Sequence, residues 1–306
     1  MSQITLRQLR YFDALARHGH FGRAAEACSI SQPALSLQIK ELEDGLGGIL
    51  FERGARRISL TKFGEDVLQR VPDILRSVDE LGDFARASQD RLVGQLRIGM
   101  IPTIAPYLLP TVIGNLAKSH PELDIHIRET LTPKLIRELA EGRLDTAIVA
   151  LPVSEPSLTE VALFAENFLL VRPSKDEGMP VPSRETLHEM KLLLLEEGHC
   201  FRDQALSFCN LQASSAQQVL DASSLSTLVQ MVGAGMGVTL IPEMAVTVET
   251  RSASVSLARF KKPQPSRTIG MVWRKTSPLA AKLLQISEVV RLSGETARGS
   301  RAPDAI

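Results

Sequence analysis

Two of the three cysteines in this 306-residue chain lie nine positions apart, in the segment EEGHCFRDQALSFCN at 196–210. Cys200 follows His199 directly, and Cys209 ends the stretch 202–209, which is expected to be helical. At a helix N-terminus, unpaired N–H groups and the helix dipole favour thiolate over thiol. A thiolate can attack a peroxide oxygen, and a second thiol can trap the resulting sulfenic acid as a disulfide. The segment is consistent with a reversible redox pair, and two unrelated core thiols are the alternative.

The spacing of the two cysteines also predicts a structural change. If the stretch between them is helical, nine residues at ~1.5 Å each separate the Cα atoms by roughly 13 Å. A disulfide needs Cα atoms within about 7 Å of each other. Leu206 and Phe208 beside Cys209 predict that this thiol starts in the core. We therefore expect that Cys200 and Cys209 can join only if part of the helix unwinds or moves.

The composition favours a reducing compartment. The chain is 44% hydrophobic and 23% charged, and its formal net charge is zero, so any affinity for nucleic acid must be local. The N-terminal residues MSQITLRQLR lack the apolar core of a signal peptide. No apolar run approaches the ~18 residues of a membrane helix. We expect a cytoplasmic protein with no membrane association, in which a permanent structural disulfide is disfavoured.

Two other kinds of site are not expected. The six histidines and three cysteines do not cluster at zinc-ligand spacing, so neither a metal nor a cofactor is expected. The glycine-rich stretch GAGMG at 233–237 follows a helical pattern and precedes a strand-like one. A dinucleotide-binding fingerprint has the reverse order, so GAGMG predicts a helix end and a tight turn.

The first sixty residues predict three short helices in the order of a helix-turn-helix. Apolar residues recur at helical spacing in 6–18, in 20–28, where Cys28 is a small core residue, and in 32–47. The first stripe is Leu6, Leu9, Phe12 and Leu15. Ser31 is the expected N-cap of the third helix, which would enter the major groove of DNA. The candidate DNA contacts are Gln32, Pro33, Ser36 and Lys40 on that helix, and Arg53, Arg56 and Arg57 in a basic wing after it.

The remaining chain divides into a linker and an effector region. Apolar residues at roughly heptad spacing predict a linker helix over 62–92 that needs a partner, and Pro72 predicts a kink or break in it. After it, strand-like and helical runs alternate, as is typical of a parallel sheet covered by helices. We expect two α/β subdomains, the second inserted in the first, followed by a disordered tail. The expected bounds are 93–295 for the effector domain, with subdomain I at about 93–165 and 267–295, subdomain II at about 166–266, and the tail at 296–306.

Two motifs near the N-terminus resemble those of LysR-type transcriptional regulators. They are AAEACSISQPALSLQIKELE at 24–43 and LFERGARRISLTKFG at 50–64. The resemblance implies an all-α winged helix-turn-helix at 1–61 and a linker helix that pairs two subunits. It also implies an effector domain of two Rossmann-like subdomains that is periplasmic-binding-protein-like.

The cysteine segment is similar to the redox segment of OxyR, the peroxide-sensing branch of this family. The likeness extends to IPTIAPYLLP at 101–110, RETLTPKLIRELAEGRLD at 128–145 and PSRTIGMVWR at 265–274. By this resemblance Cys200 is the peroxidatic cysteine and Cys209 the resolving one. The residues implied to form the peroxide pocket are Thr103, Thr132, His199, Asp203 and Arg267.

The resemblance implies a transcriptional activator of peroxide-defence genes rather than an enzyme. The implied partners are double-stranded promoter DNA, RNA polymerase, hydrogen peroxide as the signal, and glutaredoxin or thioredoxin as the reductant. A homodimer or homotetramer, nucleoid-associated when DNA-bound, is expected. Two alternatives are a LysR-type regulator of a small organic effector, with incidental cysteines, and a thiol peroxidase, against which the DNA-binding part argues.

Overall fold

The structure, a computed structural model, describes residues 4–52, 58–88, 92–187, 190–209 and 221–299. The chain forms two compact units, Met1–Asp83 and Phe84–Ile306, and each is considered by itself. The border falls inside a helix, and the expected domain limits at 61/62 and 92/93 remain predictions.

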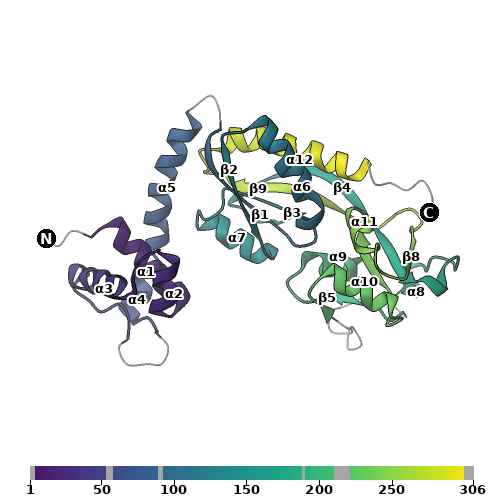
Figure 1. The fold of residues 1–306 in the computed structure, drawn as a ribbon, viewed down its shortest axis with the longest axis horizontal. Coiled ribbons are helices and arrows are strands. Elements are labelled where there is room, and N and C mark those ends of the chain that lie inside the picture. Colours follow the sequence, from purple (N-terminus) through teal and green to yellow (C-terminus); the bar gives the residue numbers. More distant parts are fainter. Residues whose placement is uncertain (1–3, 53–57, 89–91, 188–189, 210–220, 300–306) are drawn as a thin grey trace. The chain divides into compact units, whose positions relative to one another are not determined.

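The N-terminal unit is built from short helices (Figure 1). Side-chain caps fix the starts of four of them. Thr5 caps α1, His20 caps α2, Ser31 caps α3 and Thr61 caps α4, each accepting a bond from a backbone N–H of the first turn. The helices are α1 (Leu6–His18), α2 (Phe21–Ala27), α3 (Gln32–Leu46), α4 (Lys62–Leu68) and α5 (Val71–Ala87). The three helices expected from the sequence, and the Ser31 cap, are confirmed.

The core of this unit follows the apolar stripes of the first three helices, with one exception. Buried side chains include Leu9, Phe12, Leu15, Ala24, Ala25, Leu35, Ile39 and Leu42. Leu6 was expected on this stripe, but it is the first residue of α1 and is 41% exposed. Cys28 follows α2 and is half-buried.

A tight packing site joins α3 to α4. Phe51 and Leu60 pair in antiparallel fashion, and the Glu43 carboxylate accepts a bond of 2.8 Å from the Leu50 N–H. A Cβ on Gly64 would stand 2.1 Å from the Leu50 carbonyl oxygen, so the residue must be glycine for the two segments to approach this closely. The antiparallel pairing is the base expected for a wing, whose residues 53–57 lie outside the described part of the chain.

The expected linker helix is two helices. α4 ends at Leu68 and α5 begins at Val71, so Pro72 falls in the first turn of α5, where its missing N–H leaves no helical bond unmade. The break expected near Pro72 is therefore present. α5 leaves Leu81 and Phe84 exposed, at 72% and 70%.

The second unit holds a mixed sheet with the order β2-β1-β3-β9-β4-β7, and β8 also pairs with β4. The strands are β1 (Gly94–Met100), β2 (Leu123–Glu129), β3 (Thr146–Leu151), β4 (Leu158–Pro173), β5 (Leu194–Leu195), β6 (Asp221–Ala222), β7 (Thr239–Pro242), β8 (Val255–Ala258) and β9 (Ser266–Arg274). β1 is parallel to β2 and β3, as expected, but β9, β4, β7 and β8 pair in antiparallel fashion. The expectation of a parallel sheet is wrong for these strands, because β4 leads directly into the inserted subdomain and β9 returns beside it.

The long strand β4 belongs to both subdomains. Its first part pairs with β9 from Leu158 to Asn167, and its last part pairs with β7 and β8. The pairing of β4 changes from β9 to β7 and β8 after Asn167, and the expected limits of the inserted subdomain at about 166–266 remain predictions. The helices of this unit are α6 (Ala105–Ser119), α7 (Thr132–Ala140), α8 (Arg184–Leu187), α9 (Cys200–Cys209), α10 (Leu225–Gly233), α11 (Val246–Glu249) and α12 (Ala280–Gly299), with 3-10 turns η1 (Ser174–Asp176) and η3 (Glu243–Ala245).

The last helix is longer than the sequence indicated. α12 buries Leu283, Ile286 and Val290 in the core and continues to Gly299. The tail expected to be disordered from residue 296 is therefore helical in its first residues, because the apolar stripe extends to the buried Ala297. Residues 300–306 lie outside the described part.

Candidate functional site

The two cysteines of the redox segment mark the two ends of one helix. Cys200 is the first residue of α9 and is half-buried, whereas Cys209 is its last residue and is 1% exposed. Both are free thiols. A helix of this length holds the two Cα atoms roughly 13 Å apart, well beyond the reach of a disulfide. The predicted helix between the cysteines is confirmed, and it starts two residues earlier than expected.

The start of α9 is set by a turn that only glycine adopts easily. Gly198 has φ +93°, and a Cβ there would stand 3.0 Å from the Leu131 side chain. This close approach brings the loop before α9 against the residue that precedes Thr132 at the start of α7. Cys200 and Thr132, which are 68 positions apart in sequence, are thus carried on neighbouring segments.

Aromatic and ionic contacts hold α9 in place. Phe201 stacks edge-on against Phe168 of β4 at 4.8 Å between ring centroids. Phe208, one residue before Cys209, makes a similar contact with Phe260 at 5.2 Å. Arg202 donates to the Leu195 carbonyl at 2.7 Å and to the Asp221 carboxylate at 2.6 Å. Unwinding α9 would have to break or rearrange these contacts.

Arg267 organises a buried cluster next to α9. Its Nε donates to Glu166 Oε1 at 2.8 Å, and its two terminal nitrogens donate to the Thr103 hydroxyl at 2.8 Å and the Thr103 carbonyl at 3.0 Å. Its guanidinium carbon also lies 5.5 Å from the centre of the Phe201 ring. One cation therefore connects β4, the loop before α6 and the first turn of α9.

His199 is buried beside Cys200 and is expected to be neutral at pH 7. Burial lowers the pKa of its imidazole, and the Glu196 carboxylate opposes this shift only in part. A neutral imidazole has one ring nitrogen that accepts a hydrogen bond. His199 can therefore accept a proton or a hydrogen bond from a molecule that reaches Cys200.

Two buried side-chain oxygens in this region have no hydrogen-bond partner among the described residues. They are Thr132 Oγ1 at the start of α7 and Gln204 Oε1, one helical turn after Cys200 on α9. An unpaired buried polar group costs free energy, so a small polar molecule that supplied a bond here would be stabilised. Both oxygens are suited to accept a hydrogen bond from such a molecule.

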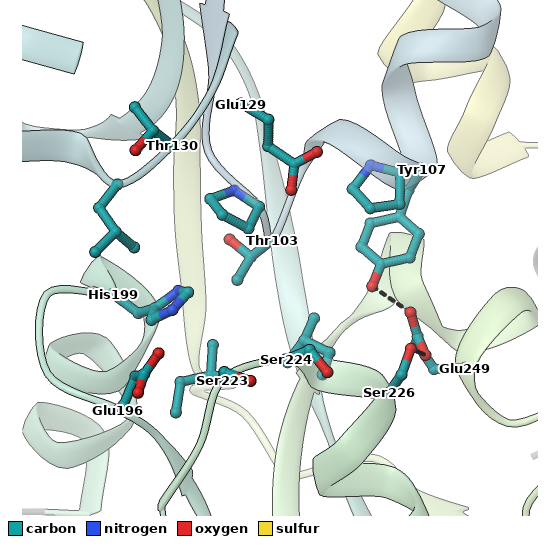
Figure 2. Close-up of a pocket in the computed structure, with 15 residues that line it drawn as sticks. Thr103, Tyr107, Glu129, Thr130, Glu196, His199, Ser223, Ser224, Ser226 and Glu249 are labelled. Carbon is teal, nitrogen blue, oxygen red and sulfur yellow. Dashed lines mark hydrogen bonds between the residues drawn. The ribbon is translucent and has the colours of Figure 1, made fainter. Parts of the chain in front are cut away.

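Two cavities meet this cluster. The first encloses about 360 Å³, and its lining includes Thr103 and His199 on one side and the Tyr107–Glu249 pair on the other (Figure 2). The Tyr107 hydroxyl donates to Glu249 at 2.6 Å, and burial together with this bond raises the pKa of Tyr107 far above its ordinary value. Ser226 donates to the same carboxylate. This pair ties α6 of subdomain I to α11 of subdomain II.

The second cavity is lined in part by Cys200. It encloses about 450 Å³ and is lined by Ala150, Leu151, Pro152, Cys200, Asp203, Gln204, Ser266, Arg267 and Thr268. Asp203 is exposed on the surface of α9, whereas Arg267 is buried.

Of the seven effector residues expected at the site, five line the two cavities. Thr103 and His199 line the first cavity, whereas Cys200, Asp203 and Arg267 line the second. Arg267 joins the two groups through its bonds to Thr103. Thr132 lines neither cavity, and Cys209 is in the core at the far end of the helix. Their roles remain predictions.

The sequence did not single out several polar residues of the site. These are Glu166, Gln204, Tyr107, Ser226 and Glu249. Glu166 and Arg267 are opposite each other in the β4–β9 register, a relation that spans 101 positions of sequence. The position of Gln204 was predictable from the sequence, because residues four apart on a helix lie on the same face and Gln204 is four positions after Cys200.

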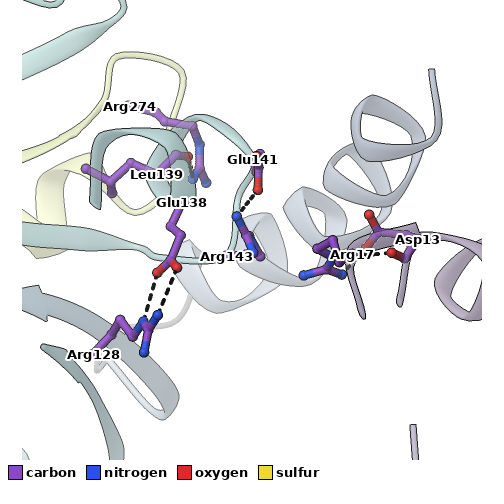
Figure 3. A network of polar contacts seen from close by, with 8 residues as sticks. All are labelled: Asp13, Arg17, Arg128, Glu138, Leu139, Glu141, Arg143 and Arg274. Atoms are coloured by element: carbon purple, nitrogen blue, oxygen red, sulfur yellow. Dashed lines mark hydrogen bonds and ion pairs between the residues drawn. The ribbon is translucent and has the colours of Figure 1, made fainter. Parts of the chain in front are cut away.

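The C-terminal end of β9, away from Arg267, holds α7, the helix that starts with Thr132. Arg274 donates to the carbonyl oxygens of Leu139 at 2.7 Å and Leu144 at 3.0 Å, and so caps the end of α7 (Figure 3). Glu138 of α7 also pairs with Arg128 of β2 at 3.3 Å. β9 therefore positions the Thr103 loop with its first residues and α7 with its last.

The expected DNA-reading face is exposed on α3. Gln32, Pro33, Ser36 and Lys40 are all exposed, while Leu35 and Ile39 on the opposite side are buried. The side chain of Leu37, 56% exposed, lies on the same outer face. Arg53, Arg56 and Arg57 of the expected wing lie outside the described residues.

Other kinds of site are not found in the part of the chain that the structure describes. Within residues 4–52, 58–88, 92–187, 190–209 and 221–299, no group of three or more His, Cys, Asp or Glu side chains could hold a metal ion. Among the same residues, no helix is long and apolar enough to cross a membrane.

A helical unit that presents an exposed recognition helix, joined to an α/β unit with a buried polar cluster and two cavities, defines a DNA-binding regulator with its own sensing domain. Residues 6–65 match the model of the bacterial regulatory helix-turn-helix proteins of the lysR family, and residues 89–292 match the LysR substrate binding domain. The chain belongs to the LysR family of bacterial transcriptional regulators.

Two relatives within the family are similar to this chain over nearly its whole length. The chain is 43% identical over 296 residues to a probable hydrogen peroxide-inducible genes activator of Streptomyces viridosporus, with 94% of each chain covered. It is 41% identical over 293 residues to the DNA-binding transcriptional dual regulator OxyR of Escherichia coli K12, covering 94% of this chain and 95% of that one.

Solved structures of OxyR proteins share the fold. A full-length OxyR variant from Pseudomonas aeruginosa has a TM-score of 0.73 at 35% identity, with 95% of each chain covered. A peroxide-bound OxyR variant from Corynebacterium glutamicum has a TM-score of 0.68 at 35% identity, covering 97% of this chain and 94% of that one.

Proposed function

We propose that this chain is a transcriptional regulator that senses hydrogen peroxide through Cys200 and Cys209 and controls peroxide-defence genes. The observation that best supports this proposal is the position of the two thiols at opposite ends of α9. Cys200 lines a cavity beside Arg267. The name of one relative, a probable hydrogen peroxide-inducible genes activator, and the peroxide-bound OxyR structure support the same signal.

The chemistry begins with attack by the Cys200 thiolate on one oxygen of hydrogen peroxide. A sulfur–oxygen bond forms, the oxygen–oxygen bond breaks, and the sulfur is oxidised by two electrons to the sulfenic acid. The hydroxide that leaves takes up a proton and becomes water. The Cys209 thiol then displaces the sulfenic oxygen as a second water, and the disulfide forms.

The pocket residues have distinct tasks in this reaction. Thr103 and Thr132 hold the peroxide by their hydroxyl groups, and His199 accepts a bond or a proton from it. Arg267 orients Thr103, and Asp203 gives the cavity mouth a polar edge. The buried Thr132 oxygen without a partner supports this role, because peroxide can donate the missing hydrogen bond.

Disulfide formation must remodel α9, because its two ends are too far apart to be joined. The Phe201–Phe168 and Phe208–Phe260 contacts would be lost or rebuilt in that change. The oxidised effector domain would then reposition the DNA-reading helices of the assembled regulator.

The wider function follows from the family. DNA binding and oligomerisation are properties of helix-turn-helix regulators of this type. We propose that a homodimer or homotetramer binds double-stranded promoter DNA and activates transcription through RNA polymerase. The reductant is proposed to be glutaredoxin or thioredoxin, and the place of action the cytoplasm, at the nucleoid when bound to DNA.

One observation favours a second candidate function. The first cavity, at about 360 Å³, is far larger than a peroxide molecule and is lined from both subdomains. A regulator that answers a small organic effector would use such a cavity, and its cysteines would then be incidental. In that case Cys200→Ser would leave induction intact.

Peptide mapping under non-reducing conditions tests the proposal. The full chain is treated with hydrogen peroxide on its target DNA, and footprinting is run on the same samples. The proposal requires a Cys200–Cys209 disulfide and a changed footprint, both absent in Cys200→Ser. Cys28 is an internal control, because burial raises the pKa of its thiol and keeps it protonated. Oxidation that spares Cys200, or a disulfide without any change in footprint, would reject it.

A further inference from the structure

The ion pair between Glu166 and Arg267 lies where the two subdomains cross. Both side chains are 0% exposed, and Arg267 Nη2 lies 2.7 Å from Glu166 Oε1. The two residues face each other across the β4–β9 ladder, one position before the last pair, Asn167 and Ser266. A charge buried this deeply is tolerated only when its partner is held in good geometry.

The bonds of Arg267 determine what the Thr103 hydroxyl can do. A guanidinium only donates hydrogen bonds, so Thr103 Oγ1 accepts from Arg267 at 2.8 Å and its own proton is left to donate elsewhere. Thr103 lines the first cavity. The same guanidinium lies against Phe201, the neighbour of Cys200 in α9.

From this arrangement we infer that Glu166 is a positioning residue for the reaction of Cys200 with peroxide. This inference rests on the proposed function. Glu166 fixes the guanidinium of Arg267, which fixes Thr103 as a donor aimed away from the cation. When the oxygen–oxygen bond breaks, a donor already in place stabilises the leaving hydroxide before that hydroxide takes up its proton.

Glu166 also has a structural role that an experiment must separate from this one. Its second carboxylate oxygen accepts a bond of 3.3 Å from the Met244 N–H. A matched control exists in the same unit, where the Asp145 carboxylate, 1% exposed, pairs with Arg97 at 2.6 Å. Glu166→Gln and Asp145→Asn both replace a buried carboxylate with an amide of the same shape.

The test compares two reagents on the full chain. Loss of the Cys200 thiol is followed by mass spectrometry with hydrogen peroxide and, separately, with iodoacetamide. Both reagents need the thiolate, but only peroxide needs a donor for a leaving hydroxide. Glu166→Gln should lower the ratio of the peroxide rate to the iodoacetamide rate by roughly tenfold to a hundredfold. Asp145→Asn should leave this ratio unchanged.

Two more variants establish the route. If Glu166 acts through Thr103, the effects of Glu166→Gln and Thr103→Val on the ratio will not add in the double variant. Glu166→Asp keeps the charge but shortens the side chain by one methylene group. The ratio of the peroxide rate to the iodoacetamide rate should therefore fall, but by less than in Glu166→Gln. Glu166→Asp takes the place of Glu166→Gln if that variant does not fold.

The outcomes separate this inference from the proposed function. A wild-type Cys200 that reacts with peroxide no faster than Cys28 overturns both. A reactive wild type with an unchanged ratio in Glu166→Gln overturns the positioning role alone. The positioning role is also overturned if Asp145→Asn lowers the rate ratio as much as Glu166→Gln does. It is overturned likewise if the effects of Glu166→Gln and Thr103→Val on the ratio add in the double variant.

Discussion

At the scale of single residues, Thr132 is the most informative position. Its hydroxyl oxygen is buried without a partner among the described residues, which destabilises the reduced fold by about 1–3 kcal/mol relative to a satisfied group. The proposed peroxide contact would supply the hydrogen bond that this oxygen lacks.

Thr132→Val should therefore change stability and reactivity in opposite directions. Valine has the same shape and no unsatisfied oxygen, so the free energy of unfolding of the reduced protein should rise by about 1 kcal/mol. Oxidation of Cys200 by peroxide should become slower, because a peroxide contact is lost.

Thr103→Val should also slow the oxidation of Cys200, but it should lower the free energy of unfolding, since it leaves Arg267 with an unused donor. Denaturant melts and timed peroxide quenching give the two quantities, and equal oxidation rates in all three proteins would remove both threonines from the mechanism.

His199 gives a prediction about pH. Burial lowers its pKa in the folded state below the ordinary value of 6.5. The unfolded chain therefore takes up a proton first as the pH falls below about 6.5, and folding stability declines until the pH passes the folded pKa. His199→Gln should flatten this part of the curve in denaturant melts between pH 7.5 and about pH 5. An identical pH dependence in the two proteins would contradict a neutral, buried imidazole.

Much of the site was predictable at residue scale, and the missing part has a physical reason. The position of Cys200 at a helix start follows from local pattern alone. Thr103, Thr132, His199, Asp203 and Arg267 came only from a family resemblance. Glu166 was missed because its pairing depends on strand register between distant segments, which one sequence does not reveal.

At the scale of elements, α9 is the part of the chain that the proposed switch must remodel. The helix is held by Phe201 at one end, by Phe208 at the other and by Arg202 between them. Hydrogen exchange across the described residues 199–209 should rise or redistribute on oxidation of the wild type, because the helical bonds there must open. It should stay unchanged in Cys200→Ser. Unchanged exchange in a sample shown to contain the Cys200–Cys209 disulfide would contradict the refolding of α9.

The recognition helix α3 gives a prediction that separates two kinds of contact. Lys40→Ala should weaken binding to all DNA sequences and lower the slope of affinity against salt by about one unit, as for a phosphate contact. Ser36→Ala and Gln32→Ala should instead change which operator variants bind best, because these side chains can reach base edges. Salt titrations on several operator variants make the comparison. If Ser36→Ala and Gln32→Ala leave both affinity and preference unchanged, the assigned face of α3 is wrong.

The elements themselves were predictable to different degrees. The helices at 6–18, 20–28 and 32–47 were expected because each has an apolar stripe and a cap or turn at its ends. The 16-residue length of β4 was not expected, because its second half continues as a buried run into another subdomain. The antiparallel return of β9 is likewise a matter of topology rather than of local pattern.

At the scale of the whole molecule, α5 indicates how subunits associate. Leu81 and Phe84 are 72% and 70% exposed on this helix, and such apolar side chains are normally covered. Leu81→Lys with Phe84→Lys should shift the protein toward monomer in sedimentation experiments and weaken binding to a full operator more than to a half-site. Lys175→Glu, a charge change on η1, is the control. An unchanged oligomer in the double variant would place the interface elsewhere.

In the proposed mechanism, the separation of the two thiols by an intact helix also limits the peroxide concentration that the sensor can report. Attack on peroxide speeds up with peroxide concentration, whereas opening of α9 is a property of the protein and has a ceiling. Above the concentration at which the first step overtakes the second, sulfenic acid accumulates at Cys200 and meets a second peroxide molecule. That encounter gives sulfinic acid, which no disulfide reductant reverses. The stability of one ten-residue helix thus sets the border between a reversible signal and permanent inactivation.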